Sequence, residues 1–297
     1  MSFSSDIKNE LASVTGNSCC ELAQAYGMAE FARSFSASAI SLQTENGAVA
    51  ARYAELLRSV CGVTAAVEAP PPERAGMYTV TVSQKDRERV LRTFGHSGGE
   101  VALRLNRGNL DCDECAYAFL RGVFLSCGAI TNPQVDYHME FSVPYLNLSR
   151  DLITLLGEYG LSAKSVRRKG NHVVYFKESE QIEDCLTAIG AMGASLELMN
   201  VKIVKNIRNN VNRAANCETA NLDKTLAASL PQIQAVQRIE QTIGLDALPE
   251  DLRELCRLRV ENPEFSLREL GEALDPPISR SGVNHRLQRV LEIAQTV

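Results

Sequence analysis

Cysteine and histidine are the usual ligands of a structural zinc site, and both occur in this sequence. The run Cys112-Asp113-Glu114-Cys115 supplies one CxxC pair, whereas His96, His138 and His172 are scattered and show no ligand spacing. A structural zinc site needs four such ligands, and no second CxxC pair or paired histidine lies near this one in the sequence. We therefore interpret the CxxC pair as reduced thiols at the start of a helix rather than as zinc ligands, and we expect no metal or other cofactor.

Motifs for nucleotide hydrolysis and for serine-nucleophile chemistry are absent from the sequence. It contains no G-x-x-x-x-G-K-[ST] loop, no G-x-G-x-x-G turn and no G-x-S-x-G elbow.

The length of 297 residues, with 45% hydrophobic and 23% charged residues, is typical of a globular protein with two compact units and room for a smaller third. Residues 1–10 are polar, and no apolar run is long enough to span a bilayer. The number of cysteines, nine, is odd, so they cannot all pair within the chain. These observations favour a cytoplasmic protein with reduced cysteines.

The formal net charge of −5 excludes a polycation, so any contact with nucleic acid must come from local clusters of lysine and arginine. Three stretches carry such clusters and no acidic residue: 163–177, 201–213 and 276–291. Their cations are Lys164, Arg167, Arg168, Lys169 and Lys177, then Lys202, Lys205, Arg208 and Arg213, and finally Arg280, Arg286 and Arg289. Each cluster taken alone is more typical of a solvated face than of a binding site.

One order of elements is expected twice in the first two thirds of the chain. The first set has a helix (20–33), a strand (36–42), an amphipathic helix stopped by Gly62, two strands separated by Pro70-Pro71-Pro72, and a helix (84–94) closed by Gly95. The second set has helices at 113–127, 146–159 and 179–189, strands at 135–141, 161–168 and 171–177, and stops at Gly160 and Gly190. Matching stops lie 98 and 95 residues apart, which favours a duplication over two unrelated domains that share an element order. We therefore predict an α+β fold, in which helices cover one face of an antiparallel sheet in each half.

Residues 194–230 differ in composition from both halves. Leu196, Met199, Ile203 and Ile207 recur at helical spacing, so the segment is predicted to begin as a long basic helix. The asparagine-rich stretch 209–221 that follows favours caps and turns over a continuous helix, with a bent helical connector as the alternative. We assign 206–230 as a linker.

Three short helices are predicted after residue 248. Pro249 suits the first turn of one helix, which Asn262-Pro263 ends, and Ser266 with Glu269 forms a capping box at the start of the next, which Asp275-Pro276-Pro277 ends. The third helix follows Ser279-Arg280-Ser281-Gly282. The expected buried positions are Leu252, Leu255 and Cys256, then Leu267, Leu270 and Leu274, and finally Val283, Leu287, Val290 and Ala294.

The last helix presents a polar face opposite its apolar stripe. At about 100° per residue, Ser281, His285, Gln288 and Arg289 point away from the core, with Asn284 and Arg286 on the flanks. Such side chains can bind base edges or phosphates, as in a helix-turn-helix, although the connection at 275–280 is longer than usual. The serine-rich start of this helix offers backbone N–H groups to a phosphate. The candidate DNA-binding residues are Ser266, Arg268, Ser279, Arg280, Ser281, Asn284, His285, Arg286, Gln288 and Arg289. A three-helix dimerisation or docking module is the alternative.

Several runs of the sequence closely resemble the WhiA family of bacterial regulators. They are 212–222, 266–271 and 281–287, together with the Cys19-Cys20 pair and Phe119-Leu120-Arg121-Gly122, and the resemblance covers nearly the whole chain. The resemblance implies a LAGLIDADG homing-endonuclease-like N-terminal domain and a C-terminal helix-turn-helix similar to region 4 of sigma factors. It also implies a role in cell division and chromosome segregation, control of sporulation genes in some members, and partnership with RNA polymerase holoenzyme and its sigma factor.

In the nuclease fold that this resemblance implies, two packed helices each deliver a carboxylate that holds a divalent metal over DNA. The similar stretches here are 25–33 and 120–128, whose catalytic positions fall on Ala32 and Cys127, and a register starting at Leu22 places Ala29 there instead. Glu30 lies about 200° around the helix from Ala32 and points away from the shared site. Without paired carboxylates a divalent metal ion has no negatively charged ligands at this position, so we expect no enzyme activity. The alternative is an active nuclease that uses other acidic residues.

These observations predict a transcriptional regulator of the nucleoid that binds double-stranded DNA, with neither a membrane nor a small molecule as partner. The expected domains are two LAGLIDADG-like repeats (1–96 and 97–205), the linker and a helix-turn-helix domain (231–297, motif about 266–297). Auxiliary, salt-sensitive DNA contacts are expected from Arg104, Arg107, Lys164, Arg167, Arg168, Lys169, Lys205 and Arg208. The alternative is an adaptor that docks on RNA polymerase or a sigma factor through 249–297 without sequence-specific DNA binding.

Overall fold

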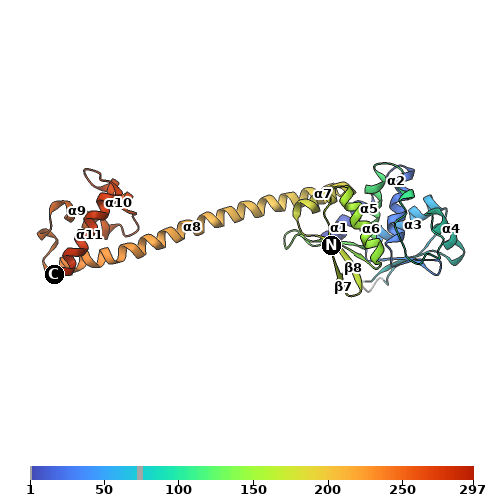
Figure 1. The fold of residues 1–297 in the computed structure, drawn as a ribbon, viewed down its shortest axis with the longest axis horizontal. Helices are drawn as coiled ribbons and strands as arrows, with labels where there is room; N and C mark the ends of the chain where they lie inside the picture. Colours follow the sequence, from blue (N-terminus) through green and yellow to red (C-terminus); the bar gives the residue numbers. More distant parts are fainter. Residues whose placement is uncertain (1, 72–75) are drawn as a thin grey trace. The chain divides into compact units, whose positions relative to one another are not determined.

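The computed structural model describes residues 2–71 and 76–297 of the chain, which Figure 1 shows as a ribbon. Two units, Met1–Val204 and Lys205–Val297, are described separately below. Among the described residues, no helix combines the length and the apolar character needed to cross a membrane. Pro72, at the end of the predicted proline loop, lies outside the described residues.

The first unit contains the predicted element order twice, after an additional helix α1 (Phe3–Ala12). The first repeat is α2 (Ser18–Glu30), β1 (Ser34–Phe35), β2 (Ile40–Thr44), α3 (Gly47–Cys61), β3 (Ala66–Glu68), β4 (Tyr78–Thr81), the 3₁₀ turn η1 (Gln84–Asp86) and α4 (Arg87–Thr93). After η2 (Arg107–Asn109), the second repeat is α5 (Cys115–Cys127), β5 (Gly128–Ile130), β6 (Met139–Val143), α6 (Leu146–Glu158), β7 (Lys164–Arg168), β8 (Asn171–Phe176) and α7 (Ser179–Ile189). The sheets have matching orders, β1-β2-β4-β3 and β5-β6-β8-β7, and every pair of strands is antiparallel. The α+β prediction with a duplicated unit is therefore confirmed.

The four predicted glycine stops end their helices in left-handed backbone. Gly62, Gly95, Gly160 and Gly190 have φ between 63° and 93°, a region that glycine enters without steric cost. The predicted strands at 36–42 and 135–141 are wrong in their bounds, because each contains a turn before the strand. The Ser36 N–H donates to the Ala39 carbonyl (2.9 Å), and the chain pairs regularly only from Ile40 onward.

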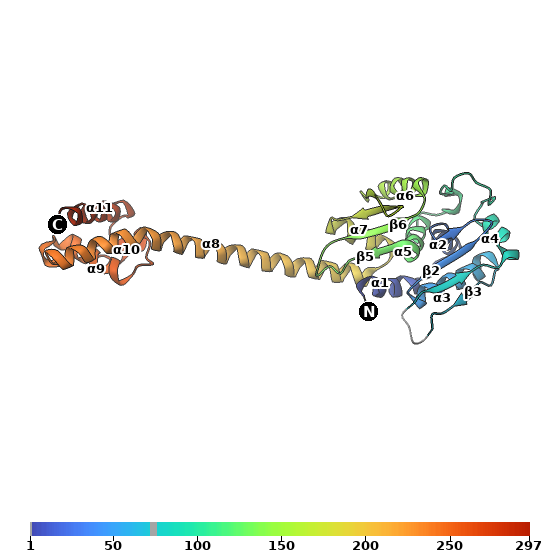
Figure 2. The ribbon, with the colours of Figure 1, turned by 90° about the horizontal axis from the view of Figure 1, so that it is seen from below.

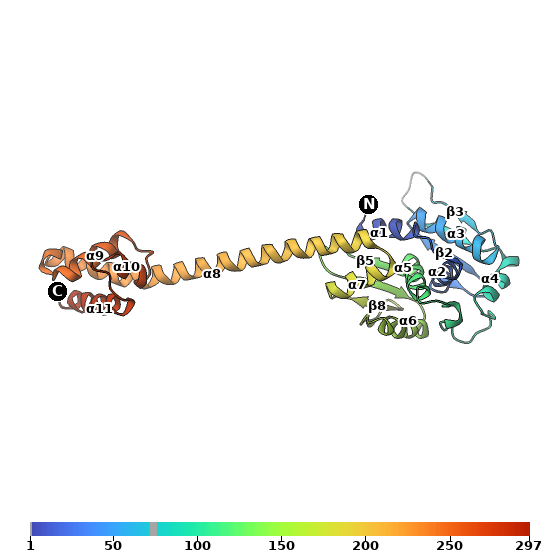
Figure 3. The same ribbon diagram turned by 90° about the horizontal axis from the view of Figure 1, so that it is seen from above.

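Helices cover one face of the strands in the first unit, and α2 and α5 lie side by side between the two sheets (Figures 1, 2 and 3). Gly27 on α2 lies against the Phe119 carbonyl of α5, and Gly122 on α5 lies against the Gln24 carbonyl of α2. The two contacts are equivalent, since each partner is 95 residues from its counterpart. Small residues at both positions allow the two backbones to approach closely, and aromatic side chains such as Tyr26 and Phe119 pack around the crossing.

Helix α8 (Met192–Thr242) is a single helix of 51 residues, so the caps and turns predicted around 209–221 are wrong. Polar side chains there remain exposed, and threonine hydroxyls donate back to carbonyls one turn earlier, as Thr219 does to Ala215 (2.9 Å). Asparagine and threonine cost less than about 0.7 kcal/mol each in a helix, so an exposed helix tolerates them. Leu196, Met199, Ile203 and Ile207 lie in this helix, as the spacing predicts, and they are exposed.

The second unit packs three helices against the end of α8. They are α9 (Glu250–Glu261), α10 (Leu267–Ala273) and α11 (Arg280–Thr296), and the 3₁₀ turn η3 (Leu245–Ala247) precedes them. Val236 and Ile239 of α8 join Leu252, Cys256 and Val290 in one buried cluster. A second cluster, which contains Leu255, Leu270, Leu274, Val283 and Leu287, fixes α10 against α11 and α9. Most of the apolar positions predicted from the helical spacing are buried, and Leu267 is partly buried.

Candidate nucleic-acid interface

The exposed face of α11 is the feature of the second unit best suited to contact a duplex. Ser279 caps this helix by accepting the Gly282 N–H on Oγ (3.3 Å), so α11 starts at Arg280, three residues before the start that the sequence analysis placed after Gly282. Val283, Leu287, Val290 and Ala294 are buried on the inner side. The residues exposed on the other side and at its start are Ser279, Arg280, Ser281, Asn284, His285, Gln288 and Arg289. Seven of the ten predicted contact residues therefore lie on one open surface.

A capping box fixes the start of α10, and a backbone hydrogen bond closes the turn between α10 and α11. The Ser266 Oγ accepts the Glu269 N–H (3.3 Å), while the Glu269 carboxylate accepts the Ser266 N–H (2.7 Å). This backbone hydrogen bond lowers the pKa of Glu269. In the turn that follows, the Ile278 N–H donates to the Gly271 carbonyl (3.0 Å), which closes the long connection that the sequence analysis noted.

Arg259 fixes the loop between α9 and α10, and the sequence analysis missed it. Its side chain is 1% exposed, and Nη1 donates to the carbonyls of Pro263 (3.2 Å) and Phe265 (2.9 Å), just before the Ser266 cap. Burial lowers the pKa of this guanidinium. The available signal was its spacing, because Arg259 continues the buried stripe of Leu252, Leu255 and Cys256.

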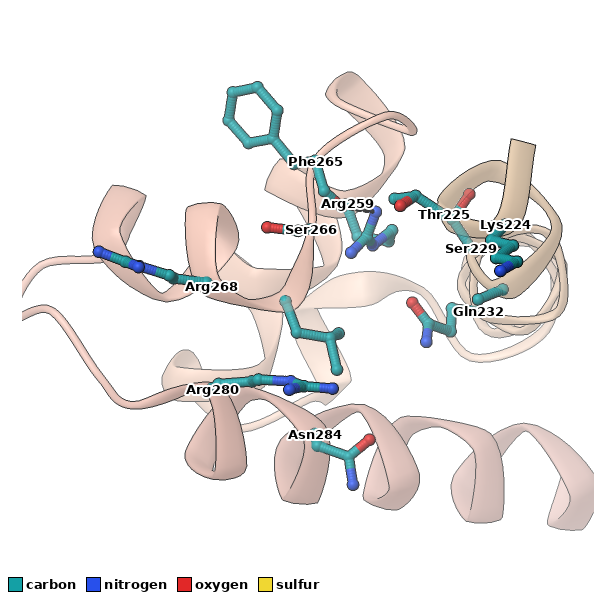
Figure 4. Close-up of a pocket in the computed structure, with 12 residues that line it drawn as sticks. Lys224, Thr225, Ser229, Gln232, Arg259, Phe265, Ser266, Arg268, Arg280 and Asn284 are labelled. Atoms are coloured by element: carbon teal, nitrogen blue, oxygen red, sulfur yellow. Dashed lines mark hydrogen bonds between the residues drawn. The ribbon is translucent and has the colours of Figure 1, made fainter. Parts of the chain in front are cut away.

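A groove of about 530 Å³ lies between α8 and the α9–α11 bundle, within the second unit (Figure 4). Ser266, Arg268, Arg280 and Asn284 of the predicted set line it. On the opposite side α8 contributes Lys224, Thr225, Ala228, Ser229 and Gln232, none of which the sequence analysis selected, because it assigned most of that stretch to a linker. Figure 4 shows Arg280 and Asn284 on α11 facing the groove from below. The residues that line this groove therefore include one cation from each of four helices, namely Lys224, Arg259, Arg268 and Arg280.

Two predicted cations of this unit are already paired. Arg286 lies 3.5 Å from the Asp251 carboxylate and donates to the Asp251 carbonyl (3.3 Å), so it turns toward α9. Arg268 pairs with Glu272 one turn along α10 (2.8 Å), a highly exposed pair that DNA can replace at small cost. Among the described residues, Arg280 and Arg289 form no ion pair.

The predicted auxiliary cations of the first unit do not form one open surface. Arg104 and Arg107 each make a two-pronged ion pair with α6, to Asp151 and Glu158 respectively, at 2.7 Å for every contact. Lys164 and Arg168 make longer pairs, with Glu178 (3.6 Å) and Glu140 (3.7 Å). Arg167 is exposed on β7, and Lys169 is exposed in the turn to β8. The other two predicted auxiliary cations, Lys205 and Arg208, belong to the second unit and lie on α8.

The ends of α2 and α5 carry no exposed carboxylate at the expected catalytic positions. Ala32 is buried beyond the end of α2, and Cys127, the last residue of α5, has a pKa that burial raises to about 12. Glu30 is fully buried on the side of His96, with Oε1 3.8 Å from the imidazole Nε2. Burial raises the pKa of Glu30 well above its usual value, because burial favours the neutral carboxyl over the charged carboxylate that a metal ion would need.

Comparison with known proteins agrees with this two-part organisation. The family model of the WhiA LAGLIDADG-like domain matches residues 116–208, and that of the WhiA C-terminal HTH domain matches residues 211–294. A probable cell division protein WhiA from Alkaliphilus metalliredigens is 40% identical over 310 residues, covering 99% of this chain and 98% of that protein. Its counterpart from Ruminiclostridium cellulolyticum is also 40% identical, over 100% of this chain and 98% of that protein. The crystal structure of full-length DUF199/WhiA from Thermatoga maritima is 26% identical, with a TM-score of 0.60 over 100% of this chain and 99% of that one. The chain therefore belongs to the WhiA family, as its sequence motifs indicate.

Proposed function

We propose that this protein is a transcriptional regulator that binds double-stranded DNA through the exposed face of α11 and acts in bacterial cell division. The observation that carries the proposal is the division of α11 into a buried apolar stripe and an open polar face with Arg280 and Arg289. The match to a helix-turn-helix domain and the names of the relatives support the same function. Roles in chromosome segregation and sporulation, and binding to RNA polymerase holoenzyme, belong to this proposal as implications of family membership.

The geometry of the second unit supports specific roles for its cations. Arg289 lies two helical turns into α11, where a side chain in the major groove meets base edges. Arg280 is the first residue of α11, beside the backbone N–H groups of its first turn, where a phosphate is best held. Lys224 of α8 faces the same groove from the other side and adds a further candidate phosphate contact.

The test is binding of the full-length chain to a chromosomal duplex recovered by footprinting of that same chain, measured by fluorescence anisotropy. Arg289→Ala is expected to weaken binding by about 1–3 kcal/mol, roughly 5- to 150-fold, and to relax specificity at one position. Arg280→Ala is expected to weaken binding to all duplexes and to reduce the slope of log K against log salt by about 1.

Arg257→Ala is the matched control, because it removes one exposed arginine from α9 without touching α11. Unchanged affinity in Arg280→Ala and Arg289→Ala would remove the assignment of α11 as the recognition helix. If the intact chain does not bind DNA at low salt but does bind RNA polymerase, the protein is a docking adaptor instead.

We infer further that the LAGLIDADG-like unit does not cut DNA. Ala32 and Cys127 supply no carboxylate, and Glu30 is fully buried, with a pKa that burial raises. Supercoiled plasmid incubated with the full-length chain and Mg²⁺ or Mn²⁺ is expected to remain supercoiled. Cleavage activity that stays with the protein through successive purification steps would contradict this inference.

A further inference from the structure

Four cysteines from distant parts of the chain converge at the start of the two central helices of the first unit. Cys19 and Cys20 lie in the first turn of α2, Cys115 is the first residue of α5, and Cys112 lies three residues before it. The Sγ atom of Cys112 is 3.6 Å from that of Cys19, 3.7 Å from that of Cys20 and 3.4 Å from that of Cys115. All four Sγ atoms lie within 4.8 Å of one another. The CxxC pair therefore lies beside the Cys19-Cys20 pair, which the sequence analysis named without connecting the two.

The spacing of these sulfur atoms matches a tetrahedral metal site. Zinc bound by thiolates has Zn–S distances of about 2.3 Å, and a tetrahedron of that size has S–S edges of about 3.8 Å. The three S–S distances from Cys112 lie within a few tenths of an ångström of that edge, whereas a disulfide bond needs about 2.05 Å. Only small side-chain movements are required to place one metal ion at equal distance from the four sulfurs.

The position of Cys112 favours a metal over disulfides. Its sulfur contacts all three other sulfurs, yet a disulfide can satisfy only one of these contacts. A pair of disulfides would also require Cys19 and Cys20 to turn toward different partners, while a single metal ion uses all four sulfurs as they lie. No histidine is needed, since four thiolates form a complete structural zinc site.

The starts of two helices enclose the cluster. Asn17 caps α2 by accepting the Cys20 N–H on Oδ1 (3.2 Å), and α2 and α5 both direct their N-terminal ends at the cluster. Cys20 and Cys115 are buried, while Cys19 and Cys112 are half-buried, so the site is shielded and still reachable from solvent.

The cluster also lies at equivalent positions of the two repeats, where a bound metal would connect them. Cys20 and Cys115 occupy equivalent positions of the two repeats, each seven residues before the glycine at the helix crossing, Gly27 or Gly122. A metal bound here would tie the starts of α2 and α5 together, opposite the helix ends that carry Ala32 and Cys127. We propose that Cys19, Cys20, Cys112 and Cys115 form a structural Zn²⁺ site that joins the two repeats. Binding exchanges thiol protons for the metal without any change of redox state.

The test uses the full-length chain, purified in reductant without a metal-binding tag, and measures bound metal by inductively coupled plasma mass spectrometry. About one zinc per chain is expected, and Cys20→Ser and Cys115→Ser are expected to lose most of it. Cys217→Ser, which removes an exposed cysteine from α8, is the matched control and should keep the zinc.

A second measurement does not depend on whether the variants fold. Wild-type chain stripped of metal under reducing conditions is titrated with Co²⁺, and the intense visible bands and near-ultraviolet charge-transfer band of tetrahedral thiolate coordination are expected. Added Zn²⁺ should replace the Co²⁺ and abolish these bands. In the chelator-treated chain, the first unit alone should unfold at a lower temperature. Absence of both zinc and the cobalt spectrum would overturn the proposal, as would peptide mapping that finds Cys112 in a disulfide in the reduced preparation. Retention of zinc in Cys20→Ser and Cys115→Ser would place the metal elsewhere.

Discussion

Gly122→Ala is expected to destabilise the first unit by about 3 kcal/mol or more, a loss at the upper end of what single substitutions cause. A Cβ at this position would lie 2.2 Å from the Gln24 carbonyl oxygen and 3.0 Å from the Met28 nitrogen, both of them backbone atoms of α2. A backbone cannot rotate away as a side chain can, so the two helices must separate. Their separation would open the aromatic packing around Tyr26 and Phe119.

The equivalent substitution Gly27→Ala tests the same contact from the other repeat, since its Cβ would lie 2.3 Å from the Phe119 carbonyl oxygen. Gly157→Ala is the matched control, because nothing lies within 4 Å of its Cβ, and alanine in α6 should be neutral or stabilising by up to about 1 kcal/mol. Hydrogen exchange of the full-length chain, followed by peptide, should show lost protection in α2 and α5 and unchanged protection in α9–α11. Equal hydrogen-exchange protection of α2 and α5 in Gly122→Ala and Gly157→Ala would contradict this prediction, because it would show that the two helices accommodate the added methyl group without loss of stability.

The second unit was predictable because its signals are local. The capping box of Ser266 and Glu269, the Asn262-Pro263 stop and the apolar stripe from Val283 to Ala294 all act within one or two helical turns. Each of them specifies an element without help from distant residues, and the structure has all three. The groove within this unit was not predictable in the same way, since it depends on α8 lying along the α9–α11 bundle.

Helix α8 was mispredicted for an energetic reason. Asparagines such as Asn209 and Asn216 favour turns, but each costs only a few tenths of a kcal/mol when a helix is anchored by packing. Leu198 and Val201 are buried in the first unit, and Val236 and Ile239 are buried in the second. A weak local preference between such anchored ends does not interrupt the helix.

Long-range pairing explains what else the sequence analysis missed. Cys20 and Cys112 are 92 residues apart, and Arg104 and Asp151 are 47 apart, so no window along the chain contains both members. The duplication held a usable signal for the cysteines. Cys20 and Cys115 precede equivalent glycines, and helices that cross at those glycines must bring their starts near each other.

Gly271→Ala is expected to abolish specific DNA binding and to destabilise the second unit by about 2–3 kcal/mol. Its Cβ would lie 2.3 Å from the Ile278 carbonyl oxygen and 3.1 Å from the Val283 Cγ2. Ile278 precedes the Ser279 cap, so displacing it moves the start of α11, where Arg280 and Ser281 lie. A recognition helix shifted by about 1 Å loses the aligned contacts on which base readout depends.

Gly282→Ala is the control for this substitution, because it lies in the first turn of α11 and its Cβ would meet neighbours only at 3.5 Å or more. Anisotropy with the footprinted duplex and hydrogen exchange of α10 and α11 separate two effects. If Gly271→Ala loses both protection and affinity while Gly282→Ala keeps both, the turn positions the recognition helix. Normal affinity in Gly271→Ala would mean that α11 binds DNA without being held by α10, because the contact between the Gly271 and Ile278 backbones could then open at no functional cost.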